Sequence, residues 1–79
     1  MIKVLFFGPV AERAGCNSLA VEHRAGLRVQ DLRDELAAQY APAFALVCFV
    51  AVNGAQVHDL SQPVSDGSEV AFMAKFSGG

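Results

Sequence analysis

The fold is decided by one stretch, residues 29–40, with the sequence VQDLRDELAAQY. Apolar side chains recur in it at Val29, Leu32, Leu36 and Tyr40, a spacing typical of a helix that buries one face. Charged residues occupy the opposite face. The stretch therefore predicts a helix that packs one face against a core and exposes the other face to water.

The two ends of this helix carry unequal signals. Arg28 occupies the N-cap position, where Ser or Thr would be expected, so we expect a poorly capped start. Asp31 in the first turn partly compensates, because a negative charge there interacts favourably with the helix dipole. Pro42 disfavours further helix, which predicts an end near residues 40–41.

Strand-like segments lie on both sides of the helix. A single helix covers only one face of a sheet, so this order predicts an α+β roll with a mixed sheet of four or five strands. The first strand is expected to be buried on both faces, and Asn53-Gly54 is a strong hairpin signal. The first and last strands are the most apolar, so we place them centrally and side by side. The predicted strands are residues 2–7, 19–23, 46–52, 55–57 and 69–74, with a short helical turn at 10–14.

Size and composition describe one small domain. The chain has 79 residues, of which 53% are hydrophobic, and its mean hydropathy of +0.35 is high for such a domain. Two explanations stay open: a core rich in alanine and valine, or apolar surface left over for a partner protein.

Charge and apolar patterning exclude several functions. The net charge is −2, and the six basic residues are scattered, so no stripe matches a nucleic acid backbone. No apolar run reaches the roughly 18 residues of a membrane span, and no signal peptide pattern opens the chain. Two cysteines do not make a secreted disulfide framework, and Cys48 is expected in the core. We therefore expect a cytoplasmic protein that binds neither nucleic acid nor membrane.

The body of the chain lacks a recognisable catalytic set. His23 and His58 are isolated and are expected at the surface, and neither has partners at metal-ligand spacing, so no metal site is predicted. Cys48 in a buried strand would be inert. No glycine-rich phosphate loop is present. Chemistry is thus expected at the end of the chain and on partner proteins.

The last residues, Gly78-Gly79, are the candidate working group. Two glycines in these positions occur by chance in about one chain in 200. A carboxylate is a poor electrophile, but a nucleotide-dependent partner could convert it to an acyl-adenylate in a narrow site that glycine alone passes. We place the domain at residues 1–74 and a flexible tail at 75–79, which spans roughly 15–17 Å when extended.

Several segments carry a resemblance that covers nearly the whole length. The chain resembles the ubiquitin-like sulfur-carrier proteins, a family that includes the small subunit of molybdopterin synthase. The segments are Met1-Ile2-Lys3-Val4-Leu5-Phe6-Phe7, Val29…Leu32-Arg33, Val52-Asn53, Asp66-Gly67-Ser68-Glu69-Val70-Ala71-Phe72 and Gly78-Gly79. The first and the fourth of these are the most specific.

The resemblance implies a ubiquitin-like β-grasp fold and a reaction cycle. An E1-like adenylyltransferase would use ATP to adenylylate Gly79, and a sulfurtransferase would complete its conversion to a thiocarboxylate. That sulfur would pass to cyclic pyranopterin monophosphate inside the large subunit of molybdopterin synthase. The chain itself would bind no cofactor and would act as a non-catalytic donor subunit, with the catalytic residues on the large subunit.

The same resemblance suggests which residues meet partners. Lys75, Phe76, Ser77 and Gly78 would insert with Gly79 into the partner site. Aromatic and Met side chains make strong anchors, so further candidate contacts are Phe6, Phe72 and Met73. Phe6 and Phe72 are alternatively core residues, because both can be buried in central strands.

One departure keeps alternatives open. The family often ends in Phe-Pro-Pro-Val-Ser/Thr-Gly-Gly, whereas this chain ends in Phe72-Met73-Ala74-Lys75-Phe76-Ser77-Gly78-Gly79. Without the prolines the tail lacks a stiff section, and its insertion costs more conformational entropy. The alternatives are a sulfur carrier for thiamine, tRNA thiolation or cysteine synthesis, a protein modifier, and a plain binding module.

Overall fold

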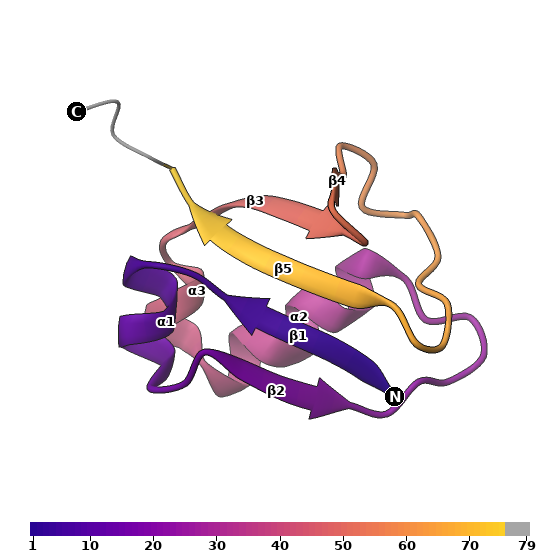
Figure 1. Ribbon diagram of the computed structural model, residues 1–79, viewed down its shortest axis with the longest axis horizontal. Coiled ribbons are helices and arrows are strands. Elements are labelled where there is room, and N and C mark those ends of the chain that lie inside the picture. The colour runs from indigo at the N-terminus through magenta and orange to yellow at the C-terminus, as the bar shows by residue number, and fades with distance from the viewer. Residues whose placement is uncertain (76–79) are drawn as a thin grey trace.

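The computed structural model describes residues 1–75 and contains one five-stranded sheet and three helices in that range (Figure 1). In chain order the elements are β1 (Ile2–Phe6), α1 (Pro9–Ala14), β2 (Ser18–Val21), α2 (Val29–Gln39), α3 (Ala41–Phe44), β3 (Val47–Val52), β4 (Ala55–Gln56) and β5 (Glu69–Ala74). The predicted order of strands and long helix is confirmed.

The sheet is mixed, with the strand order β2-β1-β5-β3-β4. The chain's first and last strands, β1 and β5, are parallel neighbours in register from Lys3–Glu69 to Phe6–Phe72. All other pairs are antiparallel. The prediction that these two strands lie centrally and side by side is confirmed, because their apolar residues gain most from neighbours on both edges.

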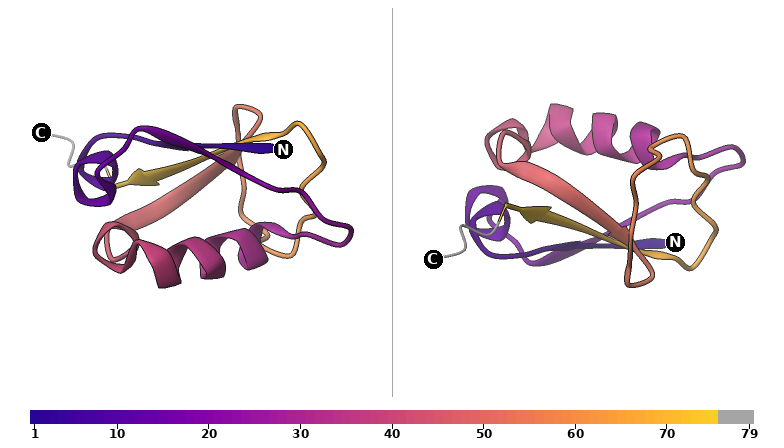
Figure 2. Two further views of the ribbon diagram at one scale, coloured as in Figure 1. Left: turned by 90° about the horizontal axis from the view of Figure 1, so that it is seen from below. Right: turned by 90° about the horizontal axis from the view of Figure 1, so that it is seen from above.

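The long helix α2 covers one face of the sheet, as the edge-on views of Figure 2 show. It buries Val29, Leu32 and Leu36, three of the residues that predicted it. Its start is capped better than the sequence suggested, because the Asp31 carboxylate accepts a hydrogen bond of 3.0 Å from the Arg28 N–H. The reciprocal bond of a capping box is missing, since the Arg28 side chain has only donors.

The first strand is buried on one face, and the prediction of two buried faces is wrong. Ile2, Val4 and Phe6 are buried, whereas Lys3 is exposed and Leu5 is half-buried. One helix layer shields only the face toward α2, so the alternate side chains of β1 remain accessible. The sequence hid this pattern because Leu5 is apolar despite its outward position.

The short helix α3 was not predicted. Pro42 ends α2, but it also occupies the first turn of α3, where proline is well tolerated. This turn brings Phe44 into an aromatic cluster, with its ring centroid 4.9 Å from that of Phe72 and 6.0 Å from that of Phe6. The three rings close the core at the end of the sheet near α1 and α3.

The hairpin between β3 and β4 is confirmed at Asn53-Gly54. Both residues have positive φ, 50° and 85°, as a primed two-residue turn requires. Asn53 also ties the turn to β5: its Oδ1 accepts a hydrogen bond of 2.9 Å from the Glu69 N–H. Asn53 thereby fixes both the hairpin and the position where β5 begins.

Candidate functional site

The candidate site is the end of β5, from which the chain continues toward Gly79. Lys75, the last described residue, is exposed. The expectations for Phe76, Ser77, Gly78 and Gly79 lie outside the described residues. Since β5 is hydrogen-bonded to β1 on one edge and to β3 on the other, the origin of the tail is held by a central strand. The residue from which the tail starts is therefore fixed by hydrogen-bonded strands on both sides.

Two of the predicted partner contacts are wrong. Phe72 is 0% exposed and Phe6 is 2% exposed, and both lie in the core. They point to the inner face of the sheet, where Phe44 and Tyr40 pack against them. The alternative that these residues belong to the core is confirmed, because α2 and α3 cover this face.

Met73, the third predicted contact, lies on the opposite face and is half-buried. Its neighbours there are apolar and also partly accessible, and we call this set the outer face: Leu5, Phe49, Ala51, Ala71 and Met73. A shallow depression of about 310 Å³ lies over β3 and β5, lined by Phe49, Ala51, Gly54, Gln56 and Met73. Phe7, just after β1, is 45% exposed.

The outer face explains the high hydropathy of the chain. Sequence reasoning missed Phe49 and Phe7, although each could have been found by strand alternation from a buried neighbour, Val50 or Phe6. Exposed aromatic and Met side chains on one face are typical of protein-binding surfaces. The surplus of apolar residues is therefore divided between a compact core and an accessible sheet face.

The titratable side chains of residues 1–75 do not assemble a catalytic set. His23 Nε2 lies 3.0 Å from the Val64 carbonyl oxygen, and His58 is exposed and distant in sequence from it. In the same part of the chain no three His, Cys, Asp or Glu side chains gather into a group that could hold a metal ion. Cys48, expected in the core, is instead exposed, because a bulge in β3 between Val47 and Phe49 displaces it from the ladder.

The described ion pairs lie at the surface and stabilise turns. The Met1 ammonium donates a hydrogen bond of 2.5 Å to Asp66, which lowers the pKa of that carboxyl. The Ser61 hydroxyl and N–H likewise lower the pKa of Asp59. These contacts position the loops before β5.

Along residues 1–75, no helix is long and apolar enough to cross a membrane. The longest helix, α2, has 11 residues.

The architecture defines the class of protein: a small α+β domain of the ubiquitin-like β-grasp type. The model of the ThiS family matches residues 4–79, and the chain therefore belongs to the ThiS family. This assignment covers the domain and extends through the terminal glycines.

Similar solved structures come from several organisms. SAMP1 from Haloferax volcanii is 25% identical, with a TM-score of 0.82 over 99% of this chain and 98% of that one. A protein assigned as subunit 1 of the molybdopterin converting factor, from Pyrococcus furiosus, is also 25% identical, with a TM-score of 0.82 over 92% and 94%. In a complex of subunits 1 and 2 of that factor from Helicobacter pylori, one chain is 23% identical, with a TM-score of 0.68 over 99% and 97%, which shows the fold alone.

No curated protein sequence matches this chain. The family model and the two structures at 25% identity indicate a sulfur carrier of the molybdopterin and thiamine type or a ubiquitin-like modifier.

Proposed function

We propose that this chain is the sulfur-donating small subunit of a molybdopterin synthase. The observation that carries the proposal is the family match, which covers residues 4–79 and so includes Gly79. The likeness to subunit 1 of the Pyrococcus converting factor supports the same pathway. The complex of two subunits from Helicobacter pylori supports a large-subunit partner for a domain of this shape.

The chemistry proposed for Gly79 has three steps. An E1-like adenylyltransferase joins the Gly79 carboxylate to AMP from ATP and releases pyrophosphate, which gives the carbonyl a good leaving group. The outer sulfur of a persulfide on a sulfurtransferase then attacks the carbonyl and displaces AMP, which forms an acyl disulfide. A thiol cleaves its S–S bond, forms a disulfide and releases the thiocarboxylate, a soft nucleophile that is ionised at neutral pH. Inside the large subunit this sulfur passes to cyclic pyranopterin monophosphate.

The domain contributes position rather than catalysis. The outer face offers Phe49 and Met73 beside the end of β5, so a partner that binds there also receives the residues that follow Lys75. Phe49 and the exposed Phe7 replace the buried Phe6 and Phe72 as proposed contacts, and Met73 is retained. We place this chemistry in the cytoplasm, where the free thiols Cys16 and Cys48 stay reduced and ATP is available.

Intact mass spectrometry tests the proposal. After incubation with ATP, a competent E1-like adenylyltransferase and a sulfur source, the mass should rise by about 16 Da as one oxygen is replaced by sulfur. A matched variant that lacks Gly79 should gain nothing. Rescue of a molybdopterin-deficient strain by the full chain, with loss of rescue by that variant, then assigns the pathway; rescue of a thiamine auxotroph alone would refute it.

A protein modifier is the second candidate, because the similarity to SAMP1 is as strong as that to the converting factor subunit. In this case Gly79 would form isopeptide bonds with lysine side chains of other proteins. Conjugates that survive boiling and reductant, and that disappear when Gly79 is deleted, would favour the modifier. Their absence in cells that form the thiocarboxylate would favour the carrier.

A further inference from the structure

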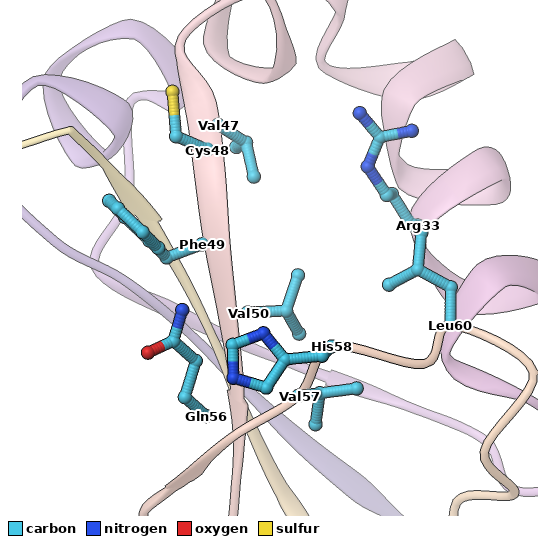
Figure 3. A pocket seen from close by; sticks show the side chains of 9 residues that line it. All are labelled: Arg33, Val47, Cys48, Phe49, Val50, Gln56, Val57, His58 and Leu60. Atoms are coloured by element: carbon cyan, nitrogen blue, oxygen red, sulfur yellow. The ribbon is translucent and has the colours of Figure 1, made fainter.

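A second concave site lies between β3 and α2 and shares Phe49 and Gln56 with the depression over β3 and β5. Its volume is about 580 Å³, within the range of ligand-binding pockets. Figure 3 shows Val47 and Val50 pointing from β3 toward the side where α2 carries Arg33, whereas Phe49 points to the other side of the strand. His58 and Leu60, from the segment after β4, close the lower end.

One wall of this pocket is an open strand edge. β4 pairs only with Ala51 and Val52, and beyond them the Val57 N–H donates a 2.8 Å hydrogen bond to the Val50 carbonyl. From Phe49 back to Val47, no strand within residues 1–75 lies on this side of β3. Such an edge presents backbone donors and acceptors to an incoming extended chain.

The charge of the lining favours an acidic ligand. Arg33 is the one charged side chain that lines the pocket, and no carboxylate lines it. Arg33 forms none of the ion pairs found in residues 1–75. Asp59, the acidic residue adjacent to His58, is held by Ser61 in its own turn. The guanidinium is thus available to a carboxylate from outside, which it can bind in bidentate geometry.

We propose that this groove binds an extended, acidic peptide segment of a partner protein by strand addition to β3. The backbone of the peptide pairs with residues 47–49, its apolar side chains pack on the half-buried Val47 and Leu60, and a carboxylate pairs with Arg33. The combination of an open edge, an apolar floor and one available cation selects this occupant over an uncharged or basic segment.

This site goes beyond the proposed sulfur transfer, and its lining excludes Leu5, Ala71 and Met73 of the outer face. Val47 is the partner of Ala74 in the ladder, so the open edge begins beside the end of β5. Phe49 and Met73 lie on the other side of the sheet from Val50. A protein held in the groove would therefore be tethered near the origin of the tail, with Met73 still accessible to a second partner.

Heteronuclear NMR tests the site with a defined probe, the capped pentapeptide Asp-Val-Ile-Val-Asp, added to the full ¹⁵N-labelled chain. We expect saturable shifts with a Kd of about 0.1–1 mM, centred on the amides of residues 47–50 and on the Arg33 side chain. A control peptide with proline at the centre cannot pair with the edge and should not bind. Absence of saturable binding, or shifts centred on Leu5, Ala71 and Met73 alone, would overturn the proposal.

A charge reversal tests the role of Arg33. Arg33→Glu should weaken binding of the pentapeptide at least about fivefold, because an attraction becomes a repulsion. Arg13→Glu makes the same charge change on α1, outside the pocket, and should leave the affinity unchanged. Equal affinity of both variants, each with native amide spectra, would refute the proposed carboxylate contact. None of these measurements involves the thiocarboxylate, so they are independent of the proposed function.

Discussion

Replacing Phe72 separates a core role from a partner-binding role on a single strand. The Phe72 ring is fully buried and lies 4.9 Å from the Phe44 ring and 6.3 Å from the Phe6 ring, measured between centroids. Phe72→Ala would remove about 3–5 kcal/mol from the free energy of unfolding. A chain of this length has about 4–12 kcal/mol in total, so the alanine variant could fail to fold.

Phe72→Leu makes the effect measurable. It retains an apolar side chain but loses the two ring–ring contacts, which predicts a loss of about 1–2 kcal/mol. For a domain of this size, that loss lowers the melting temperature by about 5–15 °C, measured by circular dichroism. The matched change on the outer face, Met73→Leu, should shift the melting temperature by less than about 3 °C, because Met73 is only partly buried.

Partner binding should show the opposite order. Met73→Asp should weaken binding to the large subunit or the E1-like enzyme at least about tenfold, measured by calorimetry, because it places a charge on the apolar outer face. Phe72→Leu, assayed well below its melting temperature, should bind nearly as well as the parent. A folded Phe72→Leu with parental stability and impaired binding would refute the assignment of Phe72 to the core.

Three further predictions concern the turns and the helix start. Asn53→Ala should lower the free energy of unfolding by about 1–2 kcal/mol, because alanine is strained at a positive φ and the Glu69 N–H loses its acceptor. Urea unfolding measures this, and an unchanged midpoint would contradict it. The pKa of Asp66 should lie below its ordinary value of about 3.9, because the Met1 ammonium donates a hydrogen bond to the carboxylate. The stability that this pair contributes is therefore present above the unfolded-state pKa. It is lost as the pH falls through the lower folded-state pKa. NMR titration measures the pKa of Asp66. An equally low pKa after N-terminal acetylation would rule out the Met1 ammonium as its cause. Asp31→Ala should cost about 1 kcal/mol in thermal unfolding, more than Asp34→Ala in the same helix, and equal effects would argue against capping by Asp31.

Much of the fold was predictable because its signals are local. The 3.6-residue spacing predicted α2 to within one residue, and Asn53-Gly54 predicted the hairpin. The last strand has the predicted bounds, 69–74. α3 escaped prediction because a proline that ends one helix can also begin the next, and only the packing of Phe44 on Phe72 shows that it does.

The candidate site was less predictable from the residues. An apolar run such as IKVLFF does not say which of its side chains faces α2, so Phe6 could be assigned either to the core or to a partner. Cys48 was expected in the core but is exposed, because the pairing of β3 with β5 contains a bulge at this residue. The sequence assigned Arg33 only to the charged face of the predicted helix. The position of β3 beside α2 in the folded domain makes Arg33 part of a pocket.

The sequence by itself predicted the strands, the long helix and their order, because hydrophobic spacing and turn residues act locally, and it is the basis for the chemistry proposed at Gly79. Tertiary structure decided which apolar residues are accessible. Whether Phe72 or Met73 meets a partner depends on the face that α2 and α3 cover, and whether β3 has an open edge depends on how far β4 extends. These properties arise from contacts between residues far apart in the chain, and local alternation shows only which residues share a face.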